Sequence, residues 1–295
     1  MKKVSRDNGG KYYLPHQAVV RENHLTTKVR VVFDASAKTT NGKSLNDVLE
    51  VGPKLQQDIF QILLKWRLWI FVLVADVEKM YRQVLVAEDD QPYQNVLWRE
   101  NLQMPIKEFV LTTVTYGTAC APFLAKRALI EIGKECSKRN PKIQAIIQDD
   151  FYMDDLMTGA DFVLECVKIY QDISQQLDKF GFKLRKWMSN ELRILEAIPD
   201  VGDNLVVRIE EGEMMKTLGV QWDPHTDNFA FYFQISEDKT LTKRKALSTL
   251  AKIFDPLGWL TPVTMLAKLF IQRLWLMDLQ WDVELNAEMK QVKAC

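Results

Sequence analysis

The sequence predicts an α+β fold in which helices cover one face of an antiparallel sheet. A wholly apolar run at residues 70–75 indicates a buried strand. Apolar residues at helical spacing over residues 162–180 indicate a helix, and Gly181 follows as its C-cap. Short helices and strands alternate along the rest of the chain. With 47% apolar residues among 295, the chain can bury a substantial core.

Local patterns predict the other elements. Before residue 130 we expect a strand at 29–34, a helix over 55–69, a helical turn up to Tyr81, a hairpin pairing 93–98 with 109–114, and a helix opened by Pro122. Later we expect strand, turn and strand over 146–157, strands near 182–184, 205–209, 218–222 and 229–233, and helices over 240–280 broken at 255–258. Met265, Leu269 and Leu276 of that last region are expected in the core.

Charge is separated along the chain although the formal net charge is zero. Residues 145–165 carry six acids and no base, whereas residues 239–275 carry seven bases against Asp255 alone. An acidic spot near a basic region suits a metal site beside a polyanion.

Several classes of protein are disfavoured. The four cysteines form no CxxC pair, so we expect neither a zinc site nor a disulfide framework. The N-terminus is polar and unlike a signal peptide. The longest apolar stretch, residues 69–75, is too short to span a bilayer. We therefore expect no membrane partner and a cytoplasmic location.

Adjacent aspartates point to one candidate site. Of three Asp-Asp pairs, those at 89–90 and 149–150 are typical of solvated turns, but the pair at 154–155 has apolar residues on both sides. Asp76 similarly ends an apolar strand. Buried carboxylates are costly unless a cation offsets their charge. If the two strands are neighbours, the three acids could hold two Mg²⁺ ions about 3.5–4 Å apart.

The segment Tyr152-Met153-Asp154-Asp155 resembles the aromatic-x-Asp-Asp motif of reverse transcriptases. Other segments resemble further motifs of that family in the same order; they are residues 73–81, residues 116–123, residues 181–184 and residues 218–222. More narrowly, residues 13–16, 30–36 and 254–258 resemble the BEL/Pao class of long-terminal-repeat retrotransposons. The resemblance covers roughly residues 11–280.

The resemblance implies a right-hand polymerase architecture. After a disordered N-terminus at 1–10, it implies fingers at 11–69 and a palm at 70–235, with a fingers hairpin near 90–115. A truncated helical thumb-like or connection segment would follow at 236–295. The activity implied is RNA-directed DNA polymerisation with two Mg²⁺ ions, for which Mn²⁺ could substitute, on an RNA or DNA template–primer with dNTPs as substrates.

The resemblance also implies site residues. Asp76, Asp154 and Asp155 would be catalytic and would hold the metals together with the backbone carbonyl of Val77. Nucleotide contacts would come from Lys28, Arg30, Tyr81, Tyr116, Gly117 and Lys186. Nucleic-acid contacts would come from Lys126, Arg127, Tyr152, Met153, Leu218, Gly219, Lys243, Arg244 and Lys245. Tyr81 would block a 2′-hydroxyl. Tyr116 departs from the family pattern, because retroviral enzymes carry Gln there.

The sequence leaves two other functions open. An RNA-dependent RNA polymerase uses a similar palm, although the large ring of Tyr81 favours deoxynucleotides. A non-catalytic remnant or domesticated nucleic-acid-binding fragment is the alternative outside the polymerases. Relatives carry protease, RNase H and integrase in the same polyprotein, inside a virus-like particle. We expect those domains to lie outside this chain.

Overall fold

The fold is built around a four-stranded antiparallel sheet. The computed structural model describes residues 1–4, 10–20, 29–136, 140–199, 206, 215–231, 240–277 and 279–285. The sheet has the order β7-β8-β4-β9. Its strands are β4 (Phe71–Val77), β7 (Phe151–Tyr152), β8 (Asp155–Ala160) and β9 (Leu184–Ser189). The strand predicted at residues 70–75 is therefore confirmed as β4, which also includes Asp76.

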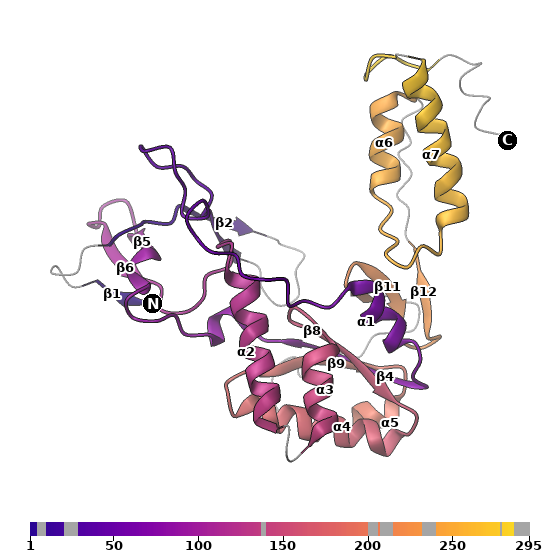
Figure 1. Ribbon diagram of the computed structural model, residues 1–295, viewed down its shortest axis with the longest axis horizontal. Coiled ribbons are helices and arrows are strands. Elements are labelled where there is room, and N and C mark those ends of the chain that lie inside the picture. The colour runs from indigo at the N-terminus through magenta and orange to yellow at the C-terminus, as the bar shows by residue number, and fades with distance from the viewer. Residues whose placement is uncertain are drawn as a thin grey trace.

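Helices cover one face of this sheet, as the sequence predicts (Figure 1). They are α2 (Ala121–Cys136), α3 (Pro141–Asp149), α4 (Val163–Asp178) and the short α5 (Leu192–Glu196). Strand side chains alternate between faces, so Leu73, Ala75 and Val77 of β4 join the core beneath these helices. The α+β class is confirmed.

A second, smaller core covers part of the opposite face. It is formed by α1 (Ile59–Trp66) and a three-stranded sheet of β10 (Met215–Thr217), β11 (Val220–Asp223) and β12 (Asn228–Ala230). Val72 and Val74 of β4 pack there against Trp66 and Trp222. The helix predicted over 55–69 is shorter than expected because Asp58 caps its start by accepting a hydrogen bond from the Phe60 N–H.

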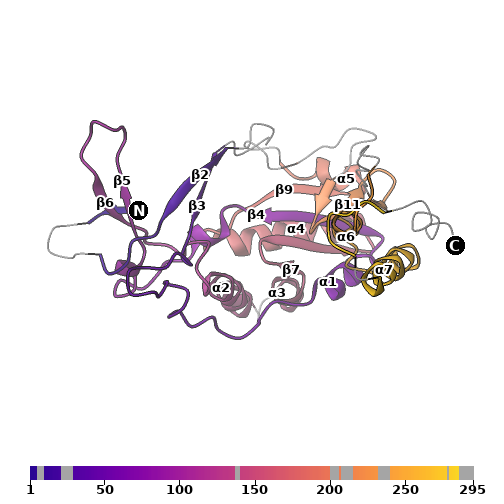
Figure 2. The ribbon, with the colours of Figure 1, turned by 90° about the horizontal axis from the view of Figure 1, so that it is seen from above.

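Two hairpins form the end of the molecule opposite α6 and α7 (Figure 2). One pairs β2 (His16–Val20) with β3 (Val29–Phe33), and the other pairs β5 (Asn95–Trp98) with β6 (Lys107–Val110). Short 3-10 turns η1 (Met80–Gln83) and η2 (Gln91–Tyr93) connect this region to β4. β1 (Lys2–Lys3) pairs with β6, so the predicted disorder of residues 1–10 is wrong for this segment.

The C-terminal region is a helical hairpin that projects from the body (Figure 1). It consists of α6 (Lys243–Ala251) and α7 (Thr261–Leu276), with the predicted break between them. Its connecting loop packs on the small sheet, where the ring centroids of Trp259 and Phe229 are 4.7 Å apart. The helices of the described residues include none long and apolar enough to cross a bilayer.

Two further sequence predictions are wrong. Residues 146–149 belong to α3 rather than to a strand, because Asn140 caps a helix that Pro141 opens. Met265, Leu269 and Leu276 are exposed on α7 rather than buried. Of the strand expected at 205–209, the described residue Val206 makes a single bridge to Trp187.

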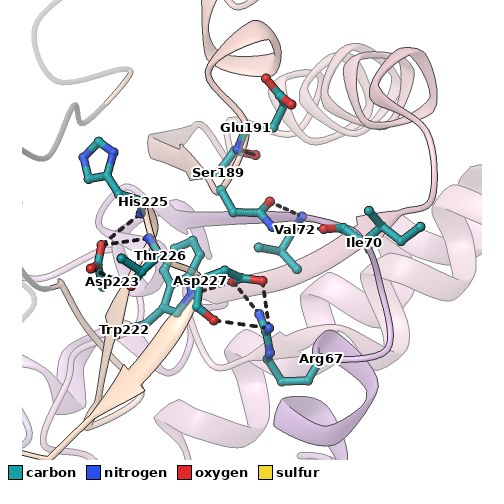
Figure 3. A network of polar contacts seen from close by, with 11 residues as sticks. Arg67, Ile70, Val72, Ser189, Glu191, Trp222, Asp223, His225, Thr226 and Asp227 are labelled. Atoms are coloured by element: carbon teal, nitrogen blue, oxygen red, sulfur yellow. Dashed lines mark hydrogen bonds and ion pairs between the residues drawn. The ribbon is translucent and has the colours of Figure 1, made fainter. Parts of the chain in front are cut away.

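A bidentate ion pair fastens the small sheet to α1 (Figure 3). Arg67, the C-cap of α1, places its two terminal guanidinium nitrogens 2.7 and 2.8 Å from the carboxylate oxygens of Asp227. The indole N–H of Trp222 donates to the same carboxylate over 2.9 Å. A charge-assisted bidentate pair of this kind is stronger than an exposed single contact.

Replacing Asp227 tests this fastening. Asp227 has a φ of 54°, which alanine tolerates poorly and asparagine tolerates well. Asp227→Ala should lower the free energy of unfolding by about 2–3 kcal/mol, because Arg67 and Trp222 lose their partner. Asp227→Asn should cost only about 1 kcal/mol. Urea denaturation measures both changes, and an Asp227→Ala protein as stable as the parent would contradict the role.

Candidate active site

The pairing of β4 with β8 brings the predicted carboxylates together. Asp76 is the direct cross-strand partner of Asp155 in this antiparallel pair. Such partners have Cα atoms about 4.5–5.5 Å apart and side chains on the same face. The Val77 N–H donates to the Asp154 backbone oxygen over 2.8 Å, which ties the next residue to the same strand. Asp76, Asp154 and Asp155 thus meet at one end of the sheet.

A tight hairpin turn presents Asp154. Tyr152 pairs with Asp155 across β7 and β8, which leaves Met153 and Asp154 as the two turn residues. Met153 has a φ of 54°, and a positive φ is what the first turn residue of a type II′ hairpin requires. The side chain of Gln56 contacts this turn, because its Oε1 accepts from the Met153 N–H over 2.9 Å. The strand–turn–strand motif was predicted correctly for residues 151–157.

Burial, and then mutual repulsion, raises the pKa values of two of the acids. Burial, followed by the neighbouring charges of Asp154 and Asp76, raises the pKa of Asp155 to about 7. Burial first, and then Asp76, also raises the pKa of Asp154, whereas Lys186 and Arg30 act to lower it. Two acids whose charge is disfavoured in this way, beside the carboxylate of Asp76, form a site suited to a cation.

Lys186 reaches the site from the other side of β4. Two residues of β9, Lys186 and Trp187, stand opposite Ala75 alone, so the pairing contains a β-bulge. Lys186 has a φ of 56°, and its Nζ lies 2.5 Å from an Asp76 carboxylate oxygen. The bulge therefore aims the ammonium at the acid that pairs with Asp155.

The donor set fits Mg²⁺ in chemistry, since the ion prefers carboxylate oxygens. In the described residues, however, the side chains of His, Cys, Asp and Glu form no group of three already placed to hold an ion. Asp76 is engaged with Lys186 instead. Asp76, Asp154 and Asp155 would hold the metal ions once Asp76 turns away from the ammonium.

Two other predicted residues lie beside the carboxylates. Tyr81 follows β4 on η1 and is half-buried, and burial together with the nearby Asp154 raises its pKa. Arg30 is an exposed residue of β3 whose charge reaches Asp154. Both residues lie where they could contact a nucleotide bound over the acids. These contacts stay predictions.

Tyr116 and Gly117 connect the β3 hairpin to the helical layer. The Tyr116 hydroxyl donates to the Val31 carbonyl oxygen over 2.5 Å, and its ring packs on Phe33. Gly117 has a φ of 97°, and a Cβ there would lie 2.5 Å from the Phe33 carbonyl oxygen. This close approach requires glycine. The two residues therefore have a structural role beside the predicted nucleotide contact.

Lys126, which was expected to contact nucleic acid, is buried instead. Lys126 is 1% exposed and donates to the backbone oxygens of Gln148 and Phe151 over 3.1 and 3.2 Å. Burial lowers its pKa to about 8, while Asp149 and Asp150 oppose that shift. Lys126 therefore stabilises the base of the hairpin from the helical side of the sheet. In this arrangement it cannot reach template phosphates.

The remaining predicted nucleic-acid contacts are dispersed. Arg127 is exposed on α2 and pairs with Glu131. The Leu218–Gly219 turn between β10 and β11 packs on the same core cluster as Tyr152. Lys243, Arg244 and Lys245 begin α6 at its end remote from the sheet (Figure 1). Lys28 lies outside the described residues.

Comparison with protein families matches the C-terminal part of the chain. Residues 242–294 match the family model of the Pao retrotransposon-like RNaseH-like domain. The match supports a BEL/Pao retrotransposon origin. It suggests a fragment of a retrotransposon polyprotein and a nucleic-acid-acting class of enzyme. No curated protein matches the chain.

The matched segment is the one for which a thumb-like role was expected. Its described part consists of α6, α7 and a bridge between Thr242 and Glu284. RNase H was expected to lie outside the chain, whereas the similarity to an RNase H-like domain lies within it. The sequence of this segment predicts two amphipathic helices, and that pattern does not distinguish a polymerase thumb from an RNase H-like domain.

The raised pKa of Asp155 predicts a pH-dependent stability. A carboxyl group with a pKa near 7 in the folded protein and about 4 in the unfolded chain stays protonated longer in the folded state. Its contribution to stability is therefore fully present below about pH 4 and is lost as the pH rises through about 7, by at most about 4 kcal/mol. Urea denaturation across this range without divalent metal measures the loss.

Asp155→Asn should remove most of this dependence, because asparagine does not titrate. The exposed Asp89 provides a control, and Asp89→Asn should keep the parental slope. Identical pH dependence in Asp155→Asn and the parent would show that Asp155 is not the group responsible.

Proposed function

We propose that this chain is the polymerase part of a retrotransposon polyprotein and performs RNA-directed DNA synthesis. The observation that carries the proposal is the register of β4 and β8, which pairs Asp76 with Asp155 on one face of the sheet beside Asp154. Two-metal nucleotidyl transfer needs carboxylates that converge in this way from separate strands. The right-hand architecture inferred from the sequence is part of the proposal.

The acids and the surrounding side chains have distinct roles in this function. Mg²⁺ ions, or Mn²⁺ in their place, would activate the primer 3′-hydroxyl and stabilise the leaving pyrophosphate. Asp76, Asp154 and Asp155 would bind the ions, with the backbone carbonyl of Val77 as a further ligand. Lys186 stands beside Asp76 at 2.5 Å and is available to approach the triphosphate when Asp76 is engaged elsewhere.

The nucleotide would lie between the carboxylates and the β3 hairpin. Arg30 on β3 carries positive charge toward Asp154, and it can offset the charge of a triphosphate bound there. Tyr81 lies beside Asp154, next to the space in which the nucleotide would bind. Its ring would contact the sugar and exclude a 2′-hydroxyl, which favours dNTPs over ribonucleotides.

The template–primer would follow the face of the sheet that carries these acids. The Leu218–Gly219 turn packs on the same cluster as Tyr152 and would hold the primer end. The basic start of α6 would add salt-dependent contacts to the duplex backbone. In the parent element we place this activity in a cytoplasmic virus-like particle, together with protease and integrase.

An RNase H-like activity is the second candidate, because the family match names such a domain. In the described part of the matched segment, carboxylates have structural partners. Asp255 accepts from the backbone N–H groups of Trp259 and Leu260, and Asp282 pairs with Arg244. This favours the polymerase site as the centre of activity in the chain. Cleavage of the RNA strand of a hybrid without any dNTP incorporation would reverse the preference.

Asp154→Asn tests the polymerase function. The substitution removes a metal ligand while it keeps the size of the side chain, so incorporation of dNTPs on an RNA template and DNA primer should fall by several orders of magnitude. Binding of the duplex should survive, because phosphate contacts lie elsewhere. Primer extension with Mg²⁺ or Mn²⁺ and a duplex-binding titration measure the two properties.

Asp161→Asn is the matched control, since Asp161 is an exposed acid just after β8. It should extend primers as the parent does. Equal extension by the parent and Asp154→Asn would exclude the proposed site, and absence of extension by the parent with either metal would favour the non-catalytic remnant.

A smaller side chain at Tyr81 should change sugar selectivity. Because the ring stands beside Asp154, Tyr81→Ala should raise ribonucleotide incorporation relative to deoxynucleotide incorporation by tenfold or more, about 1.4 kcal/mol. The ratio of kcat/KM for a ribonucleotide and its deoxy counterpart measures this selectivity. An unchanged ratio would remove the steric role, and a parent that prefers ribonucleotides would indicate an RNA polymerase.

A further inference from the structure

Gln56 binds the outer edge of the hairpin that carries the carboxylates. It lies in the loop before α1, 20 positions ahead of Asp76 in the sequence. Its side-chain Nε2 donates to the Phe151 backbone oxygen over 2.9 Å, and its Oε1 accepts from the Met153 backbone N–H over 2.9 Å. The one side chain therefore spans Tyr152.

Gln56 covers an edge of β7 with which no strand of the described residues pairs. β7 is the edge strand of its sheet, and β8 pairs with one side of it. Because Tyr152 pairs with Asp155, the peptide groups of its two neighbours point to the outer side. The amide of Gln56 donates one N–H to the Phe151 oxygen and accepts the Met153 N–H, as the N–H and C=O of one residue in a neighbouring strand would, so Gln56 substitutes for a further strand at this position.

The same contact supports a strained turn. Met153 has a φ of 54°, a conformation that costs a non-glycine residue energy unless its surroundings hold it. Gln56 holds its N–H, while Lys126 donates to the Phe151 oxygen from the helical side over 3.2 Å. The hairpin is thus restrained on both sides immediately before Asp154 and Asp155.

We propose that Gln56 is a positioning residue of the active site, which holds the turn so that Asp154 and Asp155 keep their orientation toward Asp76. This inference rests on the proposed polymerase function. The side chain touches neither acid, and it acts through the backbone of β7. Asparagine would be too short to span Tyr152, and glutamate would lack the donor and add charge beside acids that already repel one another.

Amide hydrogen exchange at Met153 tests the contact itself. Protein labelled with ¹⁵N-methionine gives a small set of amide signals, and Met153→Leu identifies the one that belongs to Met153. In Gln56→Leu the Met153 amide should exchange about tenfold faster than in the parent, because it loses its acceptor. The matched control is Gln57→Leu, since Gln57 contacts Asp149 at 3.5 Å and leaves the hairpin edge alone. It should keep the parental rate.

Kinetics test the consequence. In Gln56→Leu, kcat for dNTP addition should fall about tenfold while KM for the template–primer and the thermal unfolding midpoint stay at the values of Gln57→Leu. A general loss of structure would instead lower the midpoint and change both kinetic constants.

Either of two results would overturn the inference. One is an unchanged exchange rate of the Met153 amide in Gln56→Leu, and the other is faster exchange with kcat equal to that of Gln57→Leu. A parent protein that incorporates no dNTP, combined with fast exchange in Gln56→Leu, overturns the polymerase function and supports the restraint of the hairpin. The two failures are therefore distinguishable.

Discussion

The register between β4 and β8 is the constraint on which the site depends. Because side chains alternate along a strand, a slip of one residue would send Asp76 and Asp155 to opposite faces. Buried apolar residues on both faces prevent that slip. Leu73 and Ala75 belong to the core beneath the helices, whereas Val72 and Val74 belong to the core beneath α1. The hydrophobic pattern that folds the sheet therefore also places the carboxylates.

Bringing three acids together has a cost that neighbouring residues offset. Burial and the neighbouring charges of Asp154 and Asp76 raise the pKa of Asp155 to about 7. Lys186, which lies in a β-bulge, reduces the repulsion between the acids, and Gln56 holds the edge of the hairpin. Two residues with positive φ, Met153 and Lys186, lie within this small region. Such strain concentrates at functional sites, where the surrounding packing maintains it.

The sequence predicted the elements that long apolar patterns define. Three segments show such a pattern: the run before Asp76, the helix over 162–180 and the apolar flanks of Asp154-Asp155. In each of them the apolar residues are spaced as one buried strand or helix requires. It missed α3, although Asn140-Pro141 is a recognisable helix start. It could not reveal Gln56 or the burial of Lys126, because these contacts join residues 95 and 25 positions apart and depend on tertiary packing.

Binding of Mn²⁺, followed by electron paramagnetic resonance in the presence of a primer–template and a dNTP, tests most directly whether the acids share a metal site. Two ions should bind per parent chain, and Asp76→Asn should lose at least one of them, because Asp76 would be a ligand from β4. Asp89→Asn should bind as the parent does. Equal Mn²⁺ binding by the parent and Asp76→Asn would show that Asp76 contributes nothing to a shared metal site and that the three acids do not act together.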